Sequence, residues 1–289
     1  QVIDVNPTFE KVTGIERRKA VGSLGSELYE VEDPPYLAIC AEVARTGHEK
    51  AFEAYFPPIE KHLVICAFSP RQGYFVTVFT DETELKRTTE KLKQSVRQLR
   101  KTQQGAVQAL GTAVEFRDPY TAGHQQRVSS LAKQVAQEMG MGEDDVRGIE
   151  VAASLHDVGK VSVPTQILNK PGTLNEPEYA LVKKHPGVAY QILQNAEFPW
   201  PVDWMVRQHH ERMDGSGYPE ALKGRHIMTE AKILAVCDVV EAMSAHRPYR
   251  PAHSLEVAQE EICSGADSLY DGEVVQACLE VLGRESFRW

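Results

Sequence analysis

The sequence predicts a multi-domain chain in which a small α+β module precedes a larger all-α domain, with a long amphipathic helix between them. Its 289 residues are enough for two separate cores, because typical domains run to roughly 100–200 residues. Short apolar runs alternate with turn-forming residues in the first part of the chain, whereas helical spacing of apolar residues dominates the last part. The predicted boundaries are 1–80 for the module, 81–110 for the linking helix and 111–289 for the all-α domain.

Composition limits the possible function classes. The formal charge of −9 argues against a DNA-binding protein, which would normally carry a basic face to neutralise phosphates. Hydrophobic residues make up 42% of the chain, yet no apolar run approaches the ~20 residues of a membrane span. The five cysteines are scattered and show no Cys-x-x-Cys spacing, so we expect a reducing, cytoplasmic compartment.

The module over residues 1–80 contains two expected strands, Leu63–Ile65 and Tyr74–Phe79, with a hairpin loop between them. Three motifs, Ile3–Glu10, Thr13–Ile15 and Phe79–Glu84, resemble the start and the exit of a PAS sensor domain. The chain opens in what looks like the middle of such a domain, without its first strand. The resemblance implies either a ligand sensor or a dimerisation platform, and the sequence does not decide between them.

The linking helix carries an apolar heptad with alternating steps of four and three residues. Val96 at an a-like position, with Leu92 and Leu99 at d-like positions, favours a parallel two-stranded coiled coil. We therefore predict a homodimer through residues 85–110, with the helix passing changes in the sensor to the next domain. The alternative is an amphipathic helix packed against its own domain. The heptad positions are Leu85, Thr89, Leu92, Val96, Leu99, Gln103, Ala106 and Leu110.

Beyond Gly111 the pattern is helical almost to the end of the chain. Apolar residues follow helical spacing from Val128 to Met139, and the acids Glu143–Asp145 open the next helix, as is favoured near a helix N-terminus. Several prolines between residues 164 and 201 divide the middle into shorter helices and loops. The last helices are expected over Ile233–Met243, Leu255–Cys263 and Glu273–Leu282.

Two adjacent histidines, two further acids and a Gly-Tyr-Pro turn occur within the stretch His209–Pro219. Neighbouring residues in a helix point about 100° apart, because a turn holds ~3.6 residues. Both imidazoles can therefore serve one site only if that site is wide or lies at a helix end. A centre with more than one metal ion meets this requirement.

A second polar pair, His156-Asp157, lies in an otherwise apolar segment. Burial of an unpartnered carboxylate costs several kcal/mol, so a metal ion is the expected partner, although the dipeptide alone fits an ordinary hydrogen-bonded pair at a helix end. Asp238 is another acid within an apolar helix. With His124, His185 and the two adjacent histidines, these residues suit first-row divalent ions such as iron, manganese, nickel or zinc.

Several motifs occur together between residues 117 and 250. They are Arg117–Thr121 with Gly123-His124, Leu155–Lys160, Ile167–Gly172, Lys183 with His185-Pro186, His209–Pro219 and Arg247–Arg250. Taken together, they resemble the HD-GYP domain, an all-α branch of the HD-superfamily phosphohydrolases that hydrolyses cyclic di-GMP.

The resemblance implies a ligand set and a metal count. Asp157 is expected to bridge two ions, with iron or manganese favoured and nickel or zinc as alternatives. Some family members hold a third ion through a glutamate four residues before the first histidine, where this chain has Tyr120, so we expect two ions. The implied metal ligands are His124, His156, Asp157, His185, His209, His210 and Asp238.

Two ions roughly 3.5–4 Å apart can lower the pKa of a shared water and clamp a phosphate oxygen, which suits phosphodiester hydrolysis. Lys160, one helical turn after His156, is expected on the same face, where it would stabilise charge on the phosphoryl oxygens. Asp118 and Glu211 are expected to orient ligand histidines or to pair with arginines. Expected substrate contacts are Lys170, Lys183, Asp214, Gly217, Tyr218, Pro219, Arg247 and Arg250.

The sequence thus predicts a regulated cyclic di-GMP phosphodiesterase that forms pGpG, and it does not decide whether the reaction stops there or continues to GMP. The alternatives are a catalytically silent module that binds a cyclic dinucleotide or docks a partner such as a diguanylate-cyclase-type (GGDEF) domain, and a hydrolase of another cyclic dinucleotide or of a phosphomonoester. Mild departures from the family pattern are Ala189, Ala221, Glu241 and His246, and none removes an expected ligand.

Overall fold

The computed structural model describes residues 1–117, 123–245, 252–285, 287 and 289 of the chain. Contacts within the chain divide it into two compact units, Gln1–Arg100 and Lys101–Trp289, and the division falls inside one continuous helix, α5 (Thr83–Glu115). None of the helices in these described ranges combines the length and the apolar character that a bilayer span needs.

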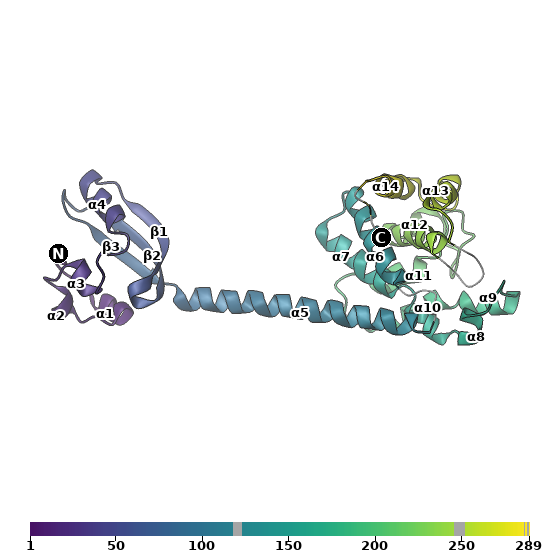
Figure 1. Cartoon of the computed structure of the whole chain (residues 1–289), viewed down its shortest axis with the longest axis horizontal. Coiled ribbons are helices and arrows are strands. Elements are labelled where there is room, and N and C mark those ends of the chain that lie inside the picture. The colour runs from purple at the N-terminus through teal and green to yellow at the C-terminus, as the bar shows by residue number, and fades with distance from the viewer. Residues whose placement is uncertain (118–122, 246–251, 286, 288) are drawn as a thin grey trace. The chain divides into compact units, whose positions relative to one another are not determined.

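The first unit contains a three-stranded antiparallel sheet in the order β1-β2-β3 and four short helices (Figure 1). The side chain of Asn6 caps the first helix by accepting a hydrogen bond from the Phe9 backbone N–H at 2.9 Å, and Gly14 ends it in the left-handed conformation. The elements are α1 (Pro7–Thr13), α2 (Arg17–Ala20), α3 (Gly25–Leu28), α4 (Leu37–Thr46), β1 (Lys50–Phe56), η1 (Pro57–Ile59), β2 (Lys61–Phe68) and β3 (Val76–Asp81).

The predicted hairpin is confirmed, since β2 and β3 pair antiparallel with Ile65 opposite Phe79. Alternate residues of β2, namely Leu63, Ile65 and Ala67, are buried on one face, and α4 packs against this strand. Strand β1 was not predicted, although it pairs with β2 along its whole length.

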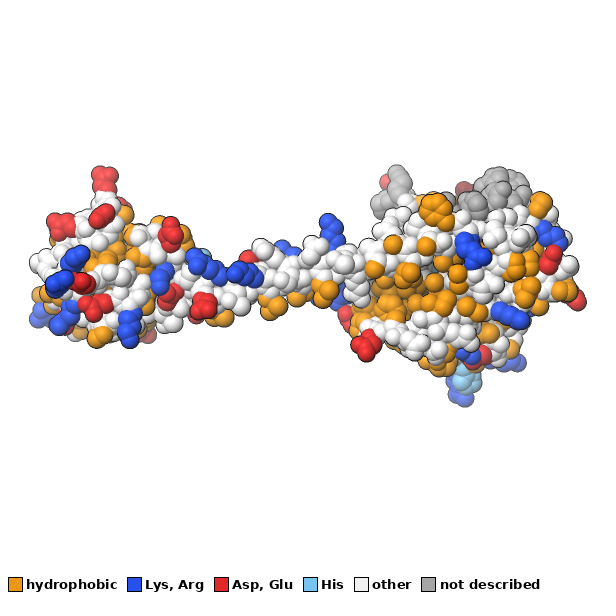
Figure 2. Space-filling model, turned by 90° about the horizontal axis from the view of Figure 1, so that it is seen from below, with side chains coloured by type: hydrophobic (Ala, Val, Ile, Leu, Met, Phe, Trp, Pro, Cys, Tyr) orange, Lys and Arg blue, Asp and Glu red, His pale blue; other side chains and the backbone are white. Residues whose placement is uncertain are grey.

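Helix α5 follows β3 directly. The Asp81 carboxylate accepts hydrogen bonds from the backbone N–H and the hydroxyl of Thr83, at 3.0 and 2.6 Å, and so fixes the first turn. Residues 84–106 are exposed in the single chain, with Leu99 70% exposed, and hydrophobic side chains recur along the helix in Figure 2. The last turns differ, because Gly111 and Val114 are buried in the second unit.

The second unit is helical, and its strand-like pairing within the described residues is limited to a single bridge between Ala266 and Tyr270. Helix α6 packs against α7, α12 and α14 and forms the centre of the core (Figure 1). The helices predicted near the C-terminus are confirmed as α12, α13 and α14. The elements are α6 (His124–Glu138), α7 (Glu143–Leu155), η3 (Val158–Ser162), α8 (Thr165–Leu168), α9 (Glu176–Val182), α10 (His185–Leu193), α11 (Val202–Gln208), η4 (Gly224–His226), α12 (Thr229–Ser244), α13 (Leu255–Ser264) and α14 (Gly272–Leu282).

Candidate metal centre

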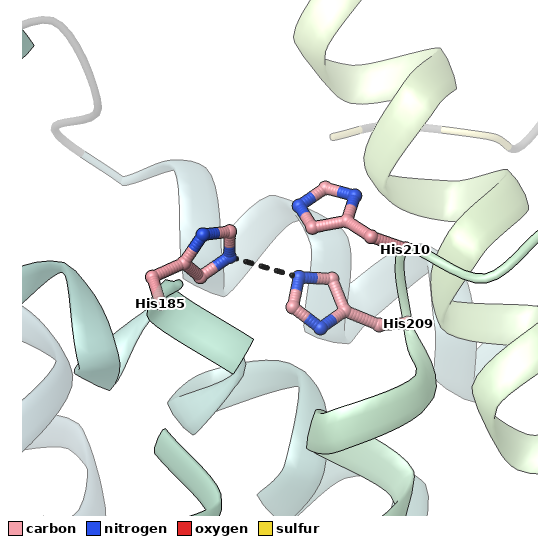
Figure 3. A group of neighbouring side chains, drawn as sticks. All are labelled: His185, His209 and His210. Atoms are coloured by element: carbon pink, nitrogen blue, oxygen red, sulfur yellow. Dashed lines mark hydrogen bonds between the residues drawn. The ribbon is translucent and has the colours of Figure 1, made fainter. Parts of the chain in front are cut away.

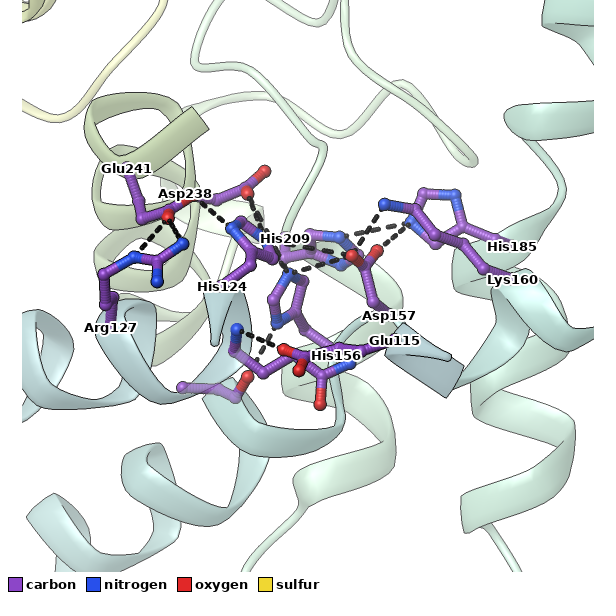
Figure 4. A network of polar contacts seen from close by, with 12 residues as sticks. Glu115, His124, Arg127, His156, Asp157, Lys160, His185, His209, Asp238 and Glu241 are labelled. Atoms are coloured by element: carbon purple, nitrogen blue, oxygen red, sulfur yellow. Dashed lines mark hydrogen bonds and ion pairs between the residues drawn. The ribbon is translucent and has the colours of Figure 1, made fainter. Parts of the chain in front are cut away.

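The seven expected ligands converge on one buried position in the second unit (Figures 3 and 4). Six of them lie at helix ends, where the chain changes direction and neighbouring side chains can point to one place. Asp238 alone comes from the middle of a helix, α12. His124 and His185 are the first residues of α6 and α10, His156-Asp157 follows the last residue of α7, and His209-His210 follows the last residue of α11.

The donor atoms form two groups with Asp157 between them. One group contains His124, His156 and Asp238, and the other contains His185, His209 and His210 (Figure 3). The Oδ2 atom of Asp157 lies 3.8 Å from His124 Nε2 and 3.6 Å from His156 Nε2. Its Oδ1 atom lies 3.5 Å from His185 Nε2. One carboxylate oxygen therefore faces each group.

The imidazole rings of His156, His185 and His209 are oriented by the backbone. Their Nδ1 atoms donate to the carbonyl oxygens of Ala153, Val182 and Val206, at 2.7, 2.8 and 2.5 Å. Since a carbonyl oxygen only accepts, the proton of each neutral ring is on Nδ1 and the lone pair on Nε2 points into the site.

These Nε2 lone pairs face other donor atoms at distances that suit a metal centre. His185 Nε2 and His209 Nε2 lie 3.4 Å apart, and two nitrogens bound to one ion at about 2.1 Å would be separated by roughly 3.0–3.4 Å. Two lone pairs at this distance repel unless a cation lies between them. These residues therefore fit a divalent metal ion. The group of His124, His156 and Asp238 has a similar spacing, with 3.3 Å between His124 Nε2 and His156 Nε2.

The electrostatics agree with this fit. Burial lowers the pKa of His185 to about 4 and that of His209 to about 3, so both rings are neutral and able to bind a metal at pH 7. Burial alone would raise the pKa of Asp157, but the charge of the neighbouring Lys160 ammonium holds it well below its usual range. The site thus keeps the Asp157 carboxylate ionised beside the neutral imidazoles of His185 and His209.

Glu241 is a functional residue that the sequence did not reveal as such. Its buried carboxylate accepts a hydrogen bond from Nδ1 of His124 and pairs with the Arg127 guanidinium, with 2.6 Å between Arg127 Nη2 and Glu241 Oε1 (Figure 4). Such a partner fixes the tautomer and orientation of a metal-binding ring. Burial would lower the pKa of His124, but hydrogen bonds with Asp238 and Glu241 raise it to about 9.

The predicted location of Lys160 on a continuous helix with His156 is wrong. Helix α7 ends at Leu155, and Lys160 lies in the following 3-10 turn, η3. From there its Nζ reaches Asp157 Oδ2 at 2.6 Å. The lysine therefore reaches the site through the bridging carboxylate and not through the face of one helix.

The structural role of Glu211 also differs from the expected one of orienting a ligand histidine or pairing with an arginine. Its carboxylate accepts from the backbone N–H groups of Glu220 and Leu222, at 2.7 and 2.9 Å, and in the described part of the chain it bonds neither a ligand histidine nor an arginine side chain. These two bonds close the loop after the Gly-Tyr-Pro turn, and the residue between them, Ala221, has a φ of 55°.

The Gly217 position needs a small residue for a reason other than backbone freedom. Its φ lies outside the left-handed range, and a Cβ atom there would lie 2.4 Å from the Arg212 backbone nitrogen and 2.5 Å from the His210 carbonyl oxygen. The loop thus packs directly on the backbone that carries His210, and the Tyr218–Pro219 peptide bond that follows is cis.

Replacement of Ala221 by glycine is expected to stabilise the second unit by up to about 1 kcal/mol, because an L-residue in the left-handed region carries a cost that glycine avoids. The urea midpoint, followed by tryptophan fluorescence, reports on this unit, since Trp200, Trp204 and Trp289 all belong to it. The exposed helical Ala180→Gly variant is the control and should destabilise by about 0.5–1 kcal/mol. A lower midpoint for Ala221→Gly would contradict the prediction.

The expected substrate contacts are only partly gathered at the site. The Tyr218 ring lies against His210, with 4.8 Å between ring centroids, and Lys183 Nζ lies 5.5 Å from the Tyr218 ring and 4.7 Å from the Tyr179 ring. Tyr179 was not predicted.

Other expected contacts are engaged elsewhere. Lys170 pairs with Glu178 at 2.6 Å, and Asp214 accepts from the Ser216 backbone N–H at 2.8 Å. Pro219 is exposed in the loop. Asp118, Tyr120, His246, Arg247 and Arg250 lie outside the described residues.

A buried set of histidines and aspartates, all but Asp238 at helix ends of an all-α domain, is typical of the helical metal-dependent phosphohydrolases centred on a His-Asp pair. The chain belongs to the HD-domain family, whose model matches residues 108–274. The predicted membership of the HD superfamily is thereby confirmed.

The chain is also similar in sequence to three curated phosphodiesterases. The chain is 37% identical over 192 residues to the cyclic di-GMP phosphodiesterase response regulator RpfG of Xanthomonas campestris, covering 66% of this chain and 51% of that protein. It is 41% identical over 177 residues to a cyclic di-GMP phosphodiesterase of Thermotoga maritima, covering 61% and 48%. It is 38% identical over 152 residues to 3'3'-cGAMP-specific phosphodiesterase 3 of Vibrio cholerae, covering 53% and 33%. The chain thus spans about half the length of the first two relatives and a third of the third.

Proposed function

We propose that the chain hydrolyses the phosphodiester bonds of cyclic di-GMP, forming pGpG and, in a second cleavage, GMP. The main support for this proposal is that the two carboxylate oxygens of Asp157 face separate groups of histidines. The names of two relatives at 37% and 41% identity support the substrate.

The ligands divide between two positions in this proposal. His124, His156 and Asp238 would hold one ion, His185, His209 and His210 would hold the other, and Asp157 would serve both. Iron or manganese suits this set of imidazoles and carboxylates, with nickel or zinc as alternatives. A bound pair of ions would supply an activated water and neutralise charge on the phosphate.

The remaining steps belong to residues of the chain. Because pGpG carries a 5′-phosphate, the bond that breaks joins phosphorus to O3′, and negative charge increases on the phosphoryl oxygens. The Lys160 ammonium, beside Asp157, stabilises that charge. The half-buried Tyr218 ring, with Lys183 Nζ 5.5 Å from it, is proposed to contact a guanine base. Arg247 and Arg250 are proposed to contact phosphate or guanine edges.

The test is hydrolysis by defined metal-loaded enzyme. The chain is purified anaerobically without metal, loaded in turn with Fe²⁺ and Mn²⁺, and its metal content is measured by mass spectrometry. Cyclic di-GMP is then followed by chromatography. Formation of pGpG in proportion to bound metal supports the proposal, whereas an intact dinucleotide under every loading would establish the silent binding module instead.

Two alternatives stay open to the same assay. The relative named a cGAMP-specific phosphodiesterase favours parallel assays with 3'3'-cGAMP, and a higher kcat/KM for that dinucleotide would change the proposed substrate but not the chemistry. A silent module would bind a cyclic dinucleotide or a GGDEF-type partner without turnover.

Regulation by the first unit is part of the proposal. Its antiparallel sheet leads directly into α5, as expected of a PAS-like sensor that acts through a helical linker. The exposed stripe of Leu85, Leu92, Val96 and Leu99 supports a parallel dimer. Free cysteines throughout the described residues support a reducing cytoplasmic location.

The dimer is tested by placing charge in the stripe. The Leu92→Glu/Leu99→Glu variant is expected to weaken association by at least ~10³-fold, because each buried leucine contributes about 1.5–3 kcal/mol. The mass is measured by light scattering during size-exclusion chromatography. The Gln94→Glu/Gln98→Glu variant adds the same charge away from the apolar a and d positions and should remain dimeric. A monomeric wild type would refute the prediction.

A further inference from the structure

The last residue of α5, Glu115, bonds to the chain on both sides of the metal-site residue His124. Its Oε2 accepts from the Gly123 backbone N–H and its Oε1 from the Gln125 backbone N–H, each at 3.0 Å (Figure 4). The first N–H groups of a helix have no partner within that helix. The N-cap residue of α6 is a glycine, which has no side chain to bond them, so a carboxylate from another helix does so.

The end of α5 is held closely at this place. Gly111 lies where a Cβ atom would be 2.2 Å from Gln125 Oε1 and 2.8 Å from the Ser154 carbonyl oxygen. One turn further on, Val114 is buried in the core of the second unit. The last turns of α5 are thus packed against the start of α6 and the end of α7, the two helix ends that present His124 and His156.

His124 is consequently fixed at two points. Glu241 orients its ring through Nδ1, whereas Glu115 fixes the backbone on both sides of its Cα atom. With both in place, His124 Nε2 lies 3.3 Å from Asp238 Oδ1 and 3.3 Å from His156 Nε2. A shift of a few tenths of an ångström in the backbone would change these distances by a similar amount.

We propose that Glu115 is a positioning residue for the ion held by His124, His156 and Asp238. This inference rests on the metal binding in the proposed function and adds a residue outside the ligand set. Glu115 also belongs to the helix that begins in the first unit, so a displacement of the end of α5 would change the affinity for this ion.

The experiment titrates Mn²⁺ into the metal-free full chain by calorimetry, with free Mn²⁺ followed by electron paramagnetic resonance. The wild type should bind two ions. Glu115→Ala should weaken one of them by about 10–100-fold, the usual effect of removing a group that orients a metal ligand. Glu115→Gln should lose less, since its amide oxygen still accepts one of the two hydrogen bonds. Far-UV circular dichroism checks that each variant is folded.

Two further variants separate positioning from general loosening. Glu150→Ala removes an ion pair between α6 and α7, with Lys133 at 2.9 Å, away from His124, and should bind both ions as the wild type does. His124→Ala combined with Glu115→Ala should be no weaker than His124→Ala alone, because both act on the same ion.

Unchanged affinity in Glu115→Ala, an equal loss in Glu150→Ala, or additive losses in the double variant would each overturn the inference. A wild type that binds no ion would overturn the proposed function, and this inference with it. Normal binding of two ions by the wild type and by Glu115→Ala would overturn the inference alone.

Discussion

Replacement of Asp157 by asparagine is expected to lower turnover of cyclic di-GMP by at least about 10³-fold and to reduce the bound metal to one ion or none. The variant keeps the shape of the side chain but removes its charge, and an amide presents only one oxygen. One of the two groups of histidines then faces an NH2 group in place of an oxygen, and the oxygen that faces the other group carries no charge. The several kcal/mol that two metal ions contribute to a phosphoryl transition state correspond to a loss of this size.

The matched control is Asp144→Asn, the same change in α7, the helix that ends just before His156-Asp157. The Asp144 side chain is 71% exposed and pairs with Arg147, so its loss should leave turnover and metal content unchanged. Metal content and product formation are measured on the same preparations. Retention of a tenth or more of the wild-type turnover by Asp157→Asn would rule out the bridging role of this carboxylate.

The ligand residues could be found from the sequence because their signals are local. A charged residue in an apolar segment, as at Asp157 and Asp238, and a histidine pair beside a rigid turn are visible without a partner. The structure adds why they converge: all but Asp238 stand at helix ends, where one short segment can direct two side chains to one place.

The residues that orient the ligands could not be found in the same way. Glu241 lies 117 residues from His124 along the chain, and Glu115 acts on backbone groups that carry no sequence signal. One clue was present, since Glu241 follows Asp238 by three residues and therefore lies on the same face of the helix. It was interpreted only as a departure from the family pattern. Strand β1 was missed because its alternation is partly polar.

Lys160 shows where local reasoning about the site was incomplete. Continuation of α7 would have placed the lysine on the face of His156, but the helix ends at Leu155. The ammonium instead contacts the Oδ2 atom of Asp157, which also faces His124 and His156. The Oδ2 atom therefore faces both the Lys160 ammonium and the proposed metal position of His124, His156 and Asp238. Lys160 balances the charge of the carboxylate, and we expect an ion bound at the same oxygen to weaken that contact.

Replacement of Lys160 by methionine is expected to lower the stability of the metal-free protein and to increase the stabilisation gained on metal binding. Without metal, the buried Asp157 loses its counter-charge, which should cost about 3–5 kcal/mol of unfolding free energy. The stabilisation gained on Mn²⁺ binding should exceed that of the wild type, because no ammonium has to be displaced. Turnover by the loaded variant should nevertheless fall by about 10²–10³-fold through loss of charge stabilisation at the phosphoryl group.

The control for Lys160→Met is Lys133→Met, which removes a partly exposed lysine from its pair with Glu150 and should change stability by less than about 1 kcal/mol. Urea unfolding with and without Mn²⁺ gives the two stabilities, and kcat is expressed per bound ion pair. A variant with unchanged kcat per ion pair would show that the lysine is only a counter-ion of the empty site. A variant with reduced kcat and a larger stabilisation by Mn²⁺ would show that the ammonium has two roles. It would pair with Asp157 in the metal-free protein and contact the substrate once the metal has released it.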